Sequence, residues 1–290
     1  MRHPNEVKAE MVGIDTIVNL TGIFEGIASL KIAQIKNQVL QSQSFFRELW
    51  EIYTQLRVDA TFHFGRSQSD EDVNPKELLI VITAEGGFSG DIDEKLIKTM
   101  LQDFDKDKHD IIVIGHHGAI QLSQRGVRIK KYYKLPSRDR NINVSPIIAE
   151  IQKYRASSAY YQQYVSLMVQ DVRHISMAAS VQEQGMSSEQ AGKEESKMEI
   201  ISEQNYIFEP STYAVVDHLE RSMLSIMLSQ IILDSKLAQY ASRFRAMSAA
   251  NDRAKENYDD LQLQFNRSRR ALADERLKEI VAGMKKLKRS

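Results

Sequence analysis

The feature that most constrains the fold is a long stretch without helix breakers at the end of the chain. No proline occurs from Ser211 to Ser290, and no glycine occurs between Ser211 and Ala282. Both residues end or bend helices, and ordinary helices run about 8 to 20 residues. We therefore predict one long helix, with at most a bend. At about 1.5 Å per residue, Ser211 to Leu287 would extend about 115 Å and would have to protrude from any compact domain.

This segment also carries a coiled-coil pattern. Apolar or small residues recur with the three-four spacing of an a/d seam over about five heptads. Asn251 and Ser268 are the polar positions of this seam, and such positions usually fix the register of a coiled coil at some cost in stability. The seam consists of Leu237, Tyr240, Phe244, Met247, Asn251, Ala254, Tyr258, Leu261, Phe265, Ser268 and Leu272.

The start of the chain offers a partner for this seam. Gly22 and Gly26 lower the helix propensity there by about 1 kcal/mol each relative to Ala, but they allow another backbone to approach closely. We predict that the two terminal helices form an antiparallel coiled coil with the middle of the chain inserted between them; two ordinary core helices of a bundle remain the alternative. The expected seam of the first helix is Ile14, Ile17, Thr21, Phe24, Ala28, Lys31, Ile35, Phe45, Leu49, Ile52 and Leu56.

The middle of the chain has the pattern of a small α/β domain. Apolar runs at Glu77–Thr83 and Asp110–Gly115 predict strands that are buried on both faces. Helical spacing of apolar residues predicts helices at Asp91–Phe104, with Asp91 as its N-cap, at His116–Arg125 and at Tyr160–Ala178. Strands that alternate with helices favour a mostly parallel, Rossmann-like βαβ sheet.

The predicted fold class is therefore α/β, with a long antiparallel coiled coil and an inserted βαβ domain. The run Gln182–Glu199 has no apolar period and is expected to be a loop. The expected boundaries are 1–60 for the N-terminal coiled-coil helix, 75–180 for the α/β domain, 181–205 for the polar loop and 206–290 for the C-terminal coiled-coil helix.

The glycine-rich turn after the first strand does not have the pattern of a phosphate-binding loop. Gly90 is followed by Asp91 where a P-loop needs lysine, and Asp91 and Asp93 would repel a phosphate. Ser89 lacks the Gly-x-Ser-x-Gly pattern of a hydrolase nucleophile. His116 and His117 lack the spacing of a metal site. We therefore expect no catalytic residue, no cofactor and no metal.

The composition of the chain limits which kinds of partner and chemistry we expect. Lys and Arg balance Asp and Glu at 39 each, and Cys is absent, which excludes disulfides and cysteine chemistry. No run of 18 apolar residues occurs, so we expect no segment that spans a bilayer. Residues 1–10 lack the pattern of a transit peptide. The segment from Lys236 to Arg289, however, contains 14 basic and 7 acidic residues. This excess favours an acidic protein partner, while the charge run alone leaves nucleic acid or anionic lipid open. Because the net charge is zero, we expect no nucleic-acid partner.

Several segments, in the same order along nearly the whole chain, resemble the gamma subunit of F-type ATP synthases. Tyr206–Ser211 resembles the segment before that family's last helix, and Thr83–Gly90 resembles its glycine-rich turn. Ile14, Ile17, Asn19 and Ile23 match its N-terminal helix. The most specific likeness, to the family's terminal signature, lies in Ala241–Lys255, Leu261, Phe265–Arg269 and Glu279–Gly283.

The resemblance implies a non-catalytic rotor subunit, attached peripherally on the cytoplasmic side of the membrane. Met11–Ile35 and Arg243–Leu287 would form a shaft inside a ring of three alpha and three beta subunits. The α/β domain would contact the epsilon subunit and the membrane ring of c subunits. Rotation would couple ion flow to ATP synthesis or hydrolysis at the beta subunits. The residues expected to contact the beta subunits or the ring interior are Arg243, Arg245, Arg267, Arg269, Arg270, Asp274, Glu275 and Arg276.

Some positions depart from the family pattern. The family's Lys-Ile-Thr-Lys-Ala-Met reads Gly22–Ile27 here, and its Arg-Gln-Ala and Thr-Gln-Glu read Arg269–Ala271 and Asp274–Arg276. Because those family residues bond the beta subunit, the changes suggest a divergent gamma subunit, as in a paralogous rotary ATPase of the sodium-pumping type. A coiled-coil scaffold or adaptor with this architecture is the alternative function, and a small α/β enzyme with helical arms is the second.

Overall fold

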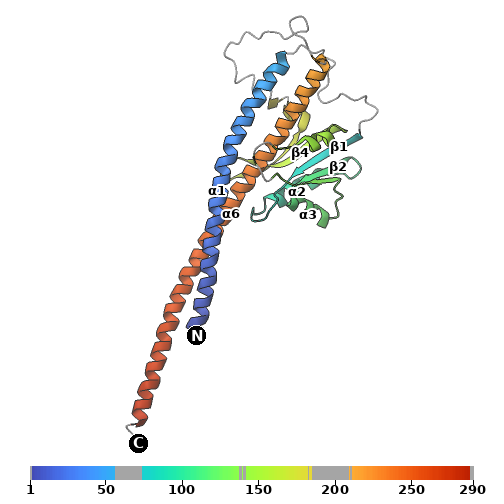
Figure 1. The fold of residues 1–290 in the computed structure, drawn as a ribbon. Helices are drawn as coiled ribbons and strands as arrows, with labels where there is room; N and C mark the ends of the chain where they lie inside the picture. Colours follow the sequence, from blue (N-terminus) through green and yellow to red (C-terminus); the bar gives the residue numbers. More distant parts are fainter. Residues whose placement is uncertain are drawn as a thin grey trace. The chain divides into compact units, whose positions relative to one another are not determined.

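The computed structural model describes residues 2–55, 74–136, 139, 142–181, 183–184, 209 and 211–287. Along the chain, the long helix α1 (Pro4–Gln55) precedes a sheet with shorter helices, and the long helix α6 (Thr212–Leu287) follows it (Figure 1). The single long helix predicted from residue 211 onward is confirmed, since α6 has 76 residues. The chain divides into two compact units, one of Met1–Ala28 with Phe244–Ser290 and one of Ser29–Arg243.

The unit Ser29–Arg243 contains a five-stranded sheet in the order β3-β2-β1-β4-β5. Strand β1 pairs in parallel with β2 and β4, and β2 pairs in parallel with β3, whereas β5 runs antiparallel to β4. The mostly parallel sheet predicted from the sequence is confirmed. The elements are β1 (Asn74–Ile82), α2 (Ile92–Asp103), β2 (His109–Ile114), α3 (His116–Gln124), β3 (Lys131–Tyr133), α4 (Ser145–Ile151), β4 (Tyr154–Tyr164) and β5 (Gln170–Ser176).

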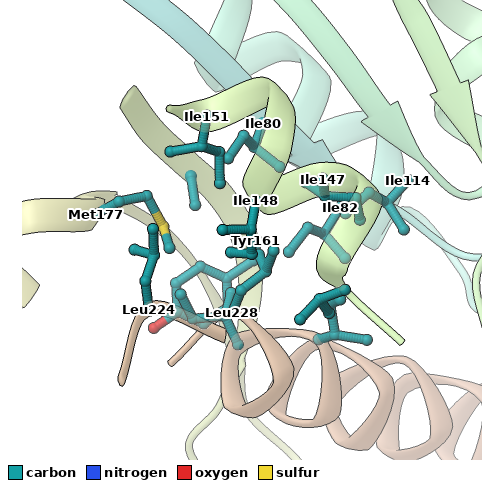
Figure 2. Close-up of a cluster of buried hydrophobic side chains, with 14 of the residues drawn as sticks. Ile80, Ile82, Ile114, Ile147, Ile148, Ile151, Tyr161, Met177, Leu224 and Leu228 are labelled. Carbon is teal, nitrogen blue, oxygen red and sulfur yellow. The ribbon is translucent and has the colours of Figure 1, made fainter. Parts of the chain in front are cut away.

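The central strand β1 is buried on both faces because successive side chains point to opposite sides of the sheet. On one face, Ile80 and Ile82 join a core with Ile148 of α4 and with Leu224 and Leu228 of α6 (Figure 2). The core on the other face includes residues of β1, α2 and α3, namely Leu79, Val81, Leu96, Ile97, Met100 and Leu122. The sheet is thus held between the long helices on one side and α2 and α3 on the other.

The helix predicted at Tyr160–Ala178 is wrong, because this segment forms most of the β4–β5 hairpin. Val165 and Met168 fit the apolar face of such a helix by their spacing, but they lie between the strands and are 59% and 63% exposed. Strand β4 pairs with β1 over several residues up to Val81↔Tyr160. Pairing with the central strand therefore overrides the local helical spacing.

In the unit Met1–Ala28 with Phe244–Ser290, α1 and α6 pack side by side in opposite directions (Figure 1). Ile17 and Phe24, predicted to lie in the seam of α1, are 46% and 37% exposed, so that part of the prediction is wrong. The observed stripe follows a strict three-four spacing one residue away from those two positions. Its buried or half-buried residues are Pro4, Val7, Met11, Ile14, Val18, Thr21, Glu25 and Ala28.

The same offset occurs in the part of α1 that packs on the sheet. Phe45 and Ile52 are 54% and 44% exposed, whereas Phe46 is fully buried. Leu56, the last residue of the predicted stripe, lies outside the described residues. Most of the predicted loop Gln182–Glu199 also lies outside them.

The glycines of α1 differ in what surrounds them. A Cβ at Gly22 would lie 3.6 Å from Nδ2 of Asn251, whereas one at Gly26 would meet nothing within 4 Å. The expected close approach of another backbone is therefore wrong for Gly26. At Gly22 the near neighbour is a side chain of α6.

Candidate partner-binding surface

A polar contact inside the helix pair fixes how α1 and α6 align. Asn251, only 5% exposed, donates from Nδ2 to the carbonyl of Val18 at 2.7 Å and to Oγ1 of Thr21 at 2.9 Å. Moving either helix by one turn would leave the buried amide of Asn251 without these partners, which costs about 1 to 3 kcal/mol. Asn251 therefore specifies one register of the pair.

The proposed seam of α6 contains both buried and half-buried positions. Tyr240, Phe244, Tyr258, Phe265 and Leu272 are half-buried. The buried ones are Leu237, Met247, Asn251, Ala254, Leu261 and Ser268. Every residue of α6 from 273 to 285 is exposed. Within the unit Met1–Ala28 with Phe244–Ser290, the last turns of α6 are thus exposed on every side.

The charged residues proposed as partner contacts fall into two groups. Arg267, Arg269 and Arg270 are exposed, as are Asp274, Glu275 and Arg276, and no hydrogen bond or ion pair within the described residues engages these six side chains. Arg245 is half-buried. The six exposed side chains are free to meet a charged surface.

Arg243 is held differently from the exposed group. Its Nε and Nη2 donate to the carbonyl of Gly87 at 3.2 and 3.1 Å, and its guanidinium carbon lies 5.1 Å from the ring centroid of Tyr240. One residue earlier, Oγ of Ser242 donates to the carbonyl of Ser89 at 2.6 Å. The glycine-rich turn is therefore tied to α6 through its carbonyl groups.

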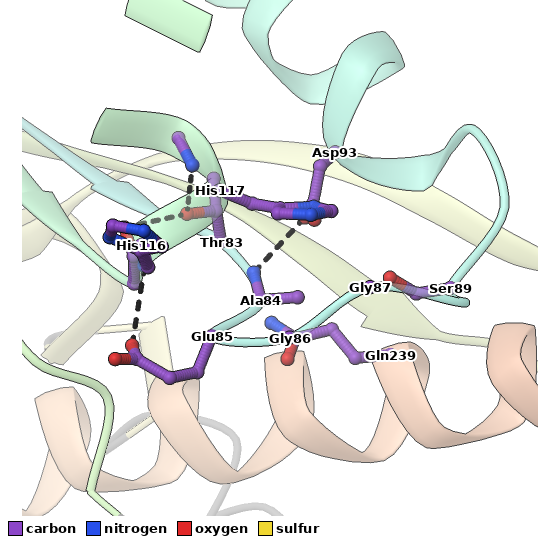
Figure 3. Close-up of polar contacts among 12 residues, drawn as sticks. Thr83, Ala84, Glu85, Gly86, Gly87, Ser89, Asp93, His116, His117 and Gln239 are labelled. Carbon is purple, nitrogen blue, oxygen red and sulfur yellow. Dashed lines mark hydrogen bonds and ion pairs between the residues drawn. The ribbon is translucent and has the colours of Figure 1, made fainter. Parts of the chain in front are cut away.

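The residues weighed as catalytic or metal-binding lie around this turn (Figure 3). Asp93 is 2% exposed; its Oδ1 accepts from the backbone N–H of Ala84 at 3.2 Å and from Nε2 of Gln162 at 2.6 Å, and its Oδ2 lies 3.1 Å from Nδ1 of His117. Burial raises the pKa of Asp93, against the opposing effect of these hydrogen bonds. Ser89 is 2% exposed.

These contacts give the buried carboxylate of Asp93 a structural role. It joins the start of α2 to the turn, to α3 and to β4. The described residues contain no group of three or more His, Asp or Glu that could hold a metal.

A second buried network joins α1 and α6 within the unit Ser29–Arg243. The carboxylate of Asp139 accepts from Nζ of Lys31 at 3.1 Å and also pairs with Lys236, whose Nζ donates to the carbonyl of Pro136 at 2.8 Å. The side chains of Asp139 and Lys236 are 7% and 4% exposed. Burial alone would raise the pKa of Asp139, but the two lysines together lower it below its ordinary value.

A large apolar surface covers the exposed side of α1. By length and composition, α1 is the one described helix that could cross a membrane: an 18-residue window has a mean hydropathy of 1.3, and only 11% of it is buried. Exposed apolar side chains also recur near the end of α6, at Leu277, Ile280, Val281 and Met284. In the part of α1 up to Ala28, the exposed apolar residues are Val12, Ile17, Leu20, Ile23, Phe24 and Ile27.

Sequence reasoning missed the exposed stripe, Asp139 with its two lysines, and the network of Asp93. Counting heptads from Val7 would have separated the buried stripe of α1 from the exposed one. No sequence pattern indicates the two networks, because their members lie up to about a hundred residues apart, as Asp139 and Lys236 do.

Comparison with known proteins gives consistent matches over the whole chain. The family model described as ATP synthase matches residues 4–287. The ATP synthase gamma chain of Chlorobium phaeobacteroides is 28% identical over 97% of both chains. That of Chlorobaculum parvum is 26% identical over 98% of both chains, and that of Enterococcus hirae is 26% identical over 96% of this chain and 97% of its own.

Solved structures share the fold. A chain of the Euglena gracilis mitochondrial ATP synthase, in the OSCP/F1/c-ring structure, aligns with a TM-score of 0.65 at 13% identity over 98% of this chain and 94% of its own. A chain in the rotor structure of the same enzyme gives 0.60 at 13% identity over 93% and 98%. At such low identity these likenesses concern the fold.

Proposed function

Because the chain belongs to the ATP synthase gamma-chain family, we propose that it is the central-stalk rotor subunit of an F-type ATP synthase. In this role it couples ion flow through the membrane ring to ATP synthesis or hydrolysis at the beta subunits. The chain is a peripheral part of the complex on the cytoplasmic side of the membrane. Its partners are the alpha and beta subunits, the epsilon subunit and the ring of c subunits.

The observation that carries the proposal is the helix pair with its exposed continuation. Asn251 sets the register of α1 against α6, and α6 continues beyond Leu272 with every residue to 285 exposed. Apolar side chains such as Ile280 and Met284 on such a surface require a partner. A surrounding ring of subunits supplies one.

The exposed charges are assigned to the same surroundings. Arg267, Arg269 and Arg270 meet acidic loops of the beta subunits, and Asp274, Glu275 and Arg276 contact the ring interior. Arg243 and Arg245 lie where the helix pair approaches the ring. The attraction of the arginines to an acidic surface guides and aligns the pair rather than supplying most of its affinity. The apolar face of α1 lies against these subunits and not in lipid.

The chain itself is non-catalytic in this proposal. Hydrogen bonds from Arg243 and Ser242 occupy the carbonyls of the glycine-rich turn, and Ser89 is buried. The chain acts by turning, because an asymmetric shaft changes which beta subunit is open to nucleotide. The coupling is carried by a rigid element between distant sites.

Copurification tests the proposal directly. A tagged full chain expressed in its own cells should bring down alpha and beta subunits at a ratio of one to three to three, and the isolated assembly should hydrolyse ATP. Recovery of the chain only as a stable monomer or homodimer would refute the rotor and favour the scaffold or adaptor. ATP hydrolysis by the chain alone, abolished by Ser89→Ala, would favour the enzyme.

A further inference from the structure

A cavity of about 470 Å³ lies between α1, the β4–β5 hairpin and α6, inside the unit Ser29–Arg243. Asp234 of α6 and Glu183 line it, together with Tyr161, Tyr164 and Gln230. Among the described residues, no Lys, Arg or His lines this cavity. Its wall therefore favours a cation.

Asp234 supplies a negative charge on the cavity wall. It accepts a hydrogen bond from the backbone N–H of Tyr164 at 3.4 Å, and in the described part of the chain no cation lies within ion-pair distance of it. Burial raises its pKa to about 6. At neutral pH the carboxylate is still mostly ionised and lacks a counter-charge, a condition that is costly away from water and typical of binding sites.

The amide of Gln230 provides a second, independent observation. This side chain is 8% exposed, and its Oε1 accepts from Nε2 of Gln184 at 2.8 Å. Its Nε2 is buried and has no hydrogen-bond partner among the described residues. Gln230 and Asp234 are four residues apart, so they are neighbours on one face of α6. The cavity wall therefore holds a buried amide donor without a partner, one helical turn from a carboxylate without a counter-charge.

The charged and titratable groups in and near the cavity do not neutralise Asp234. Arg173 of β5 donates from Nε to Oε1 of Gln163 at 2.6 Å and is engaged there. Burial, followed by the charge of Asp234, raises the pKa of Tyr161 to about 12, so its ring stays neutral. Aromatic rings of this kind attract organic cations.

We propose that this cavity binds a lysine side chain of a partner protein, with the ammonium group on Asp234 and with a rotation of the Gln230 amide that lets Nε2 donate to the lysine's backbone carbonyl. A lysine residue carries both groups that the cavity lacks, a cation and an acceptor. The inference goes beyond the rotor role, because it concerns a site that the free chain already contains.

The isolated full chain tests the inference with a small probe. N-acetyl-lysine-N′-methylamide carries the ammonium and the amide carbonyls, and the norleucine analogue lacks only the ammonium. At pH 8 and constant ionic strength, a tenfold excess of the lysine probe over its Kd should raise the melting temperature by about 3 °C. The norleucine probe should raise it by less than a third of that.

Two variants locate the effect. Asp234→Asn, which keeps the shape of the side chain, should abolish the shift, and the exposed control Asp252→Asn should retain it. An equal shift in Asp234→Asn, or none in the unaltered chain, would overturn the inference. Carbodiimide treatment of the assembled complex should also link Asp234 to a partner lysine. If 1,5-diaminopentane stabilises the chain as much as the lysine probe and no such link forms, a free amine and not a protein is the occupant, and the inference is wrong.

Discussion

At the residue scale, the most informative side chains are polar groups buried where apolar ones would suffice. Asn251 and Asp93 are satisfied by several hydrogen bonds each, and they fix the helix register and the glycine-rich turn. Asp234 is the exception, because a single backbone hydrogen bond does not offset the effect of its burial. A residue of this kind lowers stability unless something binds it.

The pH dependence of stability should expose Asp234. Its folded pKa of about 6 lies above its ordinary value of 3.8, so its contribution is fully present below pH 3.8 and is lost as the pH rises through 6. At 1.36 kcal/mol per pKa unit, Asp234→Asn should therefore raise the free energy of unfolding at pH 8 by about 2 to 3 kcal/mol. Urea unfolding at pH 4 and pH 8 measures this. A gain that is equal at both pH values would contradict the assignment, and Asp252→Asn on the exposed face of α6 is the control.

At the element scale, the seam between α1 and α6 decides stability. Leu261 is 7% exposed and Leu263, two residues away on the same helix, is 56% exposed. Leu261→Asp buries an unpaired charge and should destabilise the helix pair by about 3 kcal/mol or more, whereas Leu263→Asp should cost less than about 0.5 kcal/mol. Thermal unfolding followed by circular dichroism compares the two. Equal melting temperatures would mean that Leu261 is not in the interface.

The ion cluster of Asp139 makes a separate prediction for the two long helices. Asp139→Ala leaves Lys236 charged and buried, which should cost about 3 to 5 kcal/mol. Lys31→Ala, at the more exposed end of the cluster, should cost less than about 1 kcal/mol. Because the pKa of Asp139 is lowered, its contribution is present above its unfolded pKa and is lost as the pH falls through the folded one. The difference between Asp139→Ala and the unaltered chain should therefore shrink on acidification, and a constant difference would count against the pairing.

The sequence predicted elements well where a single period dominated. Strand β1, helices α2 and α3, and the whole of α6 follow from apolar runs and spacing. The β4–β5 hairpin did not follow, because its aromatic residues fit a helical period as well and only pairing with β1 decides between the two. On α1, two adjacent apolar stripes share the three-four spacing, and only contact with α6 shows that Val18 and not Ile17 is inside.

At the scale of the whole molecule, the exposed arginines of α6 should matter for coupling and not for folding. Replacing Arg267, Arg269 and Arg270 together by Ala should leave the melting temperature of the isolated chain within about 1 °C, since exposed charges contribute little to stability. In the assembled complex, the same change should lower ion pumping per ATP hydrolysed. For the melting temperature of the isolated chain, the control replaces Lys106, Arg125 and Arg128, which are exposed on the α/β domain, and removes the same charge. Fully coupled hydrolysis in the α6 variant would remove the role assigned to this cluster.

The candidate partner-binding surface was only partly predictable, because its form depends on contacts between distant parts of the chain. The family resemblance implied partner contacts at Arg267, Arg269 and Arg270, which are exposed, but it grouped them with Arg243, which is held by the turn of Gly86 and Gly87. The apolar face of α1 was read as the inside of a pair because periodicity does not tell which of two stripes is covered. Contacts across the chain supply that information.

The cluster of Lys31, Asp139 and Lys236 has a mechanical consequence. Apolar attraction between helices is non-directional, so by itself it fixes their relative position less sharply than a hydrogen-bonded ion pair does. A carboxylate shared by a lysine from each helix cannot slip without stranding a charge. Torque applied to one long helix is therefore passed to the other partly through the two oxygens of this carboxylate, which resist shear together with the hydrogen bonds of Asn251 to α1.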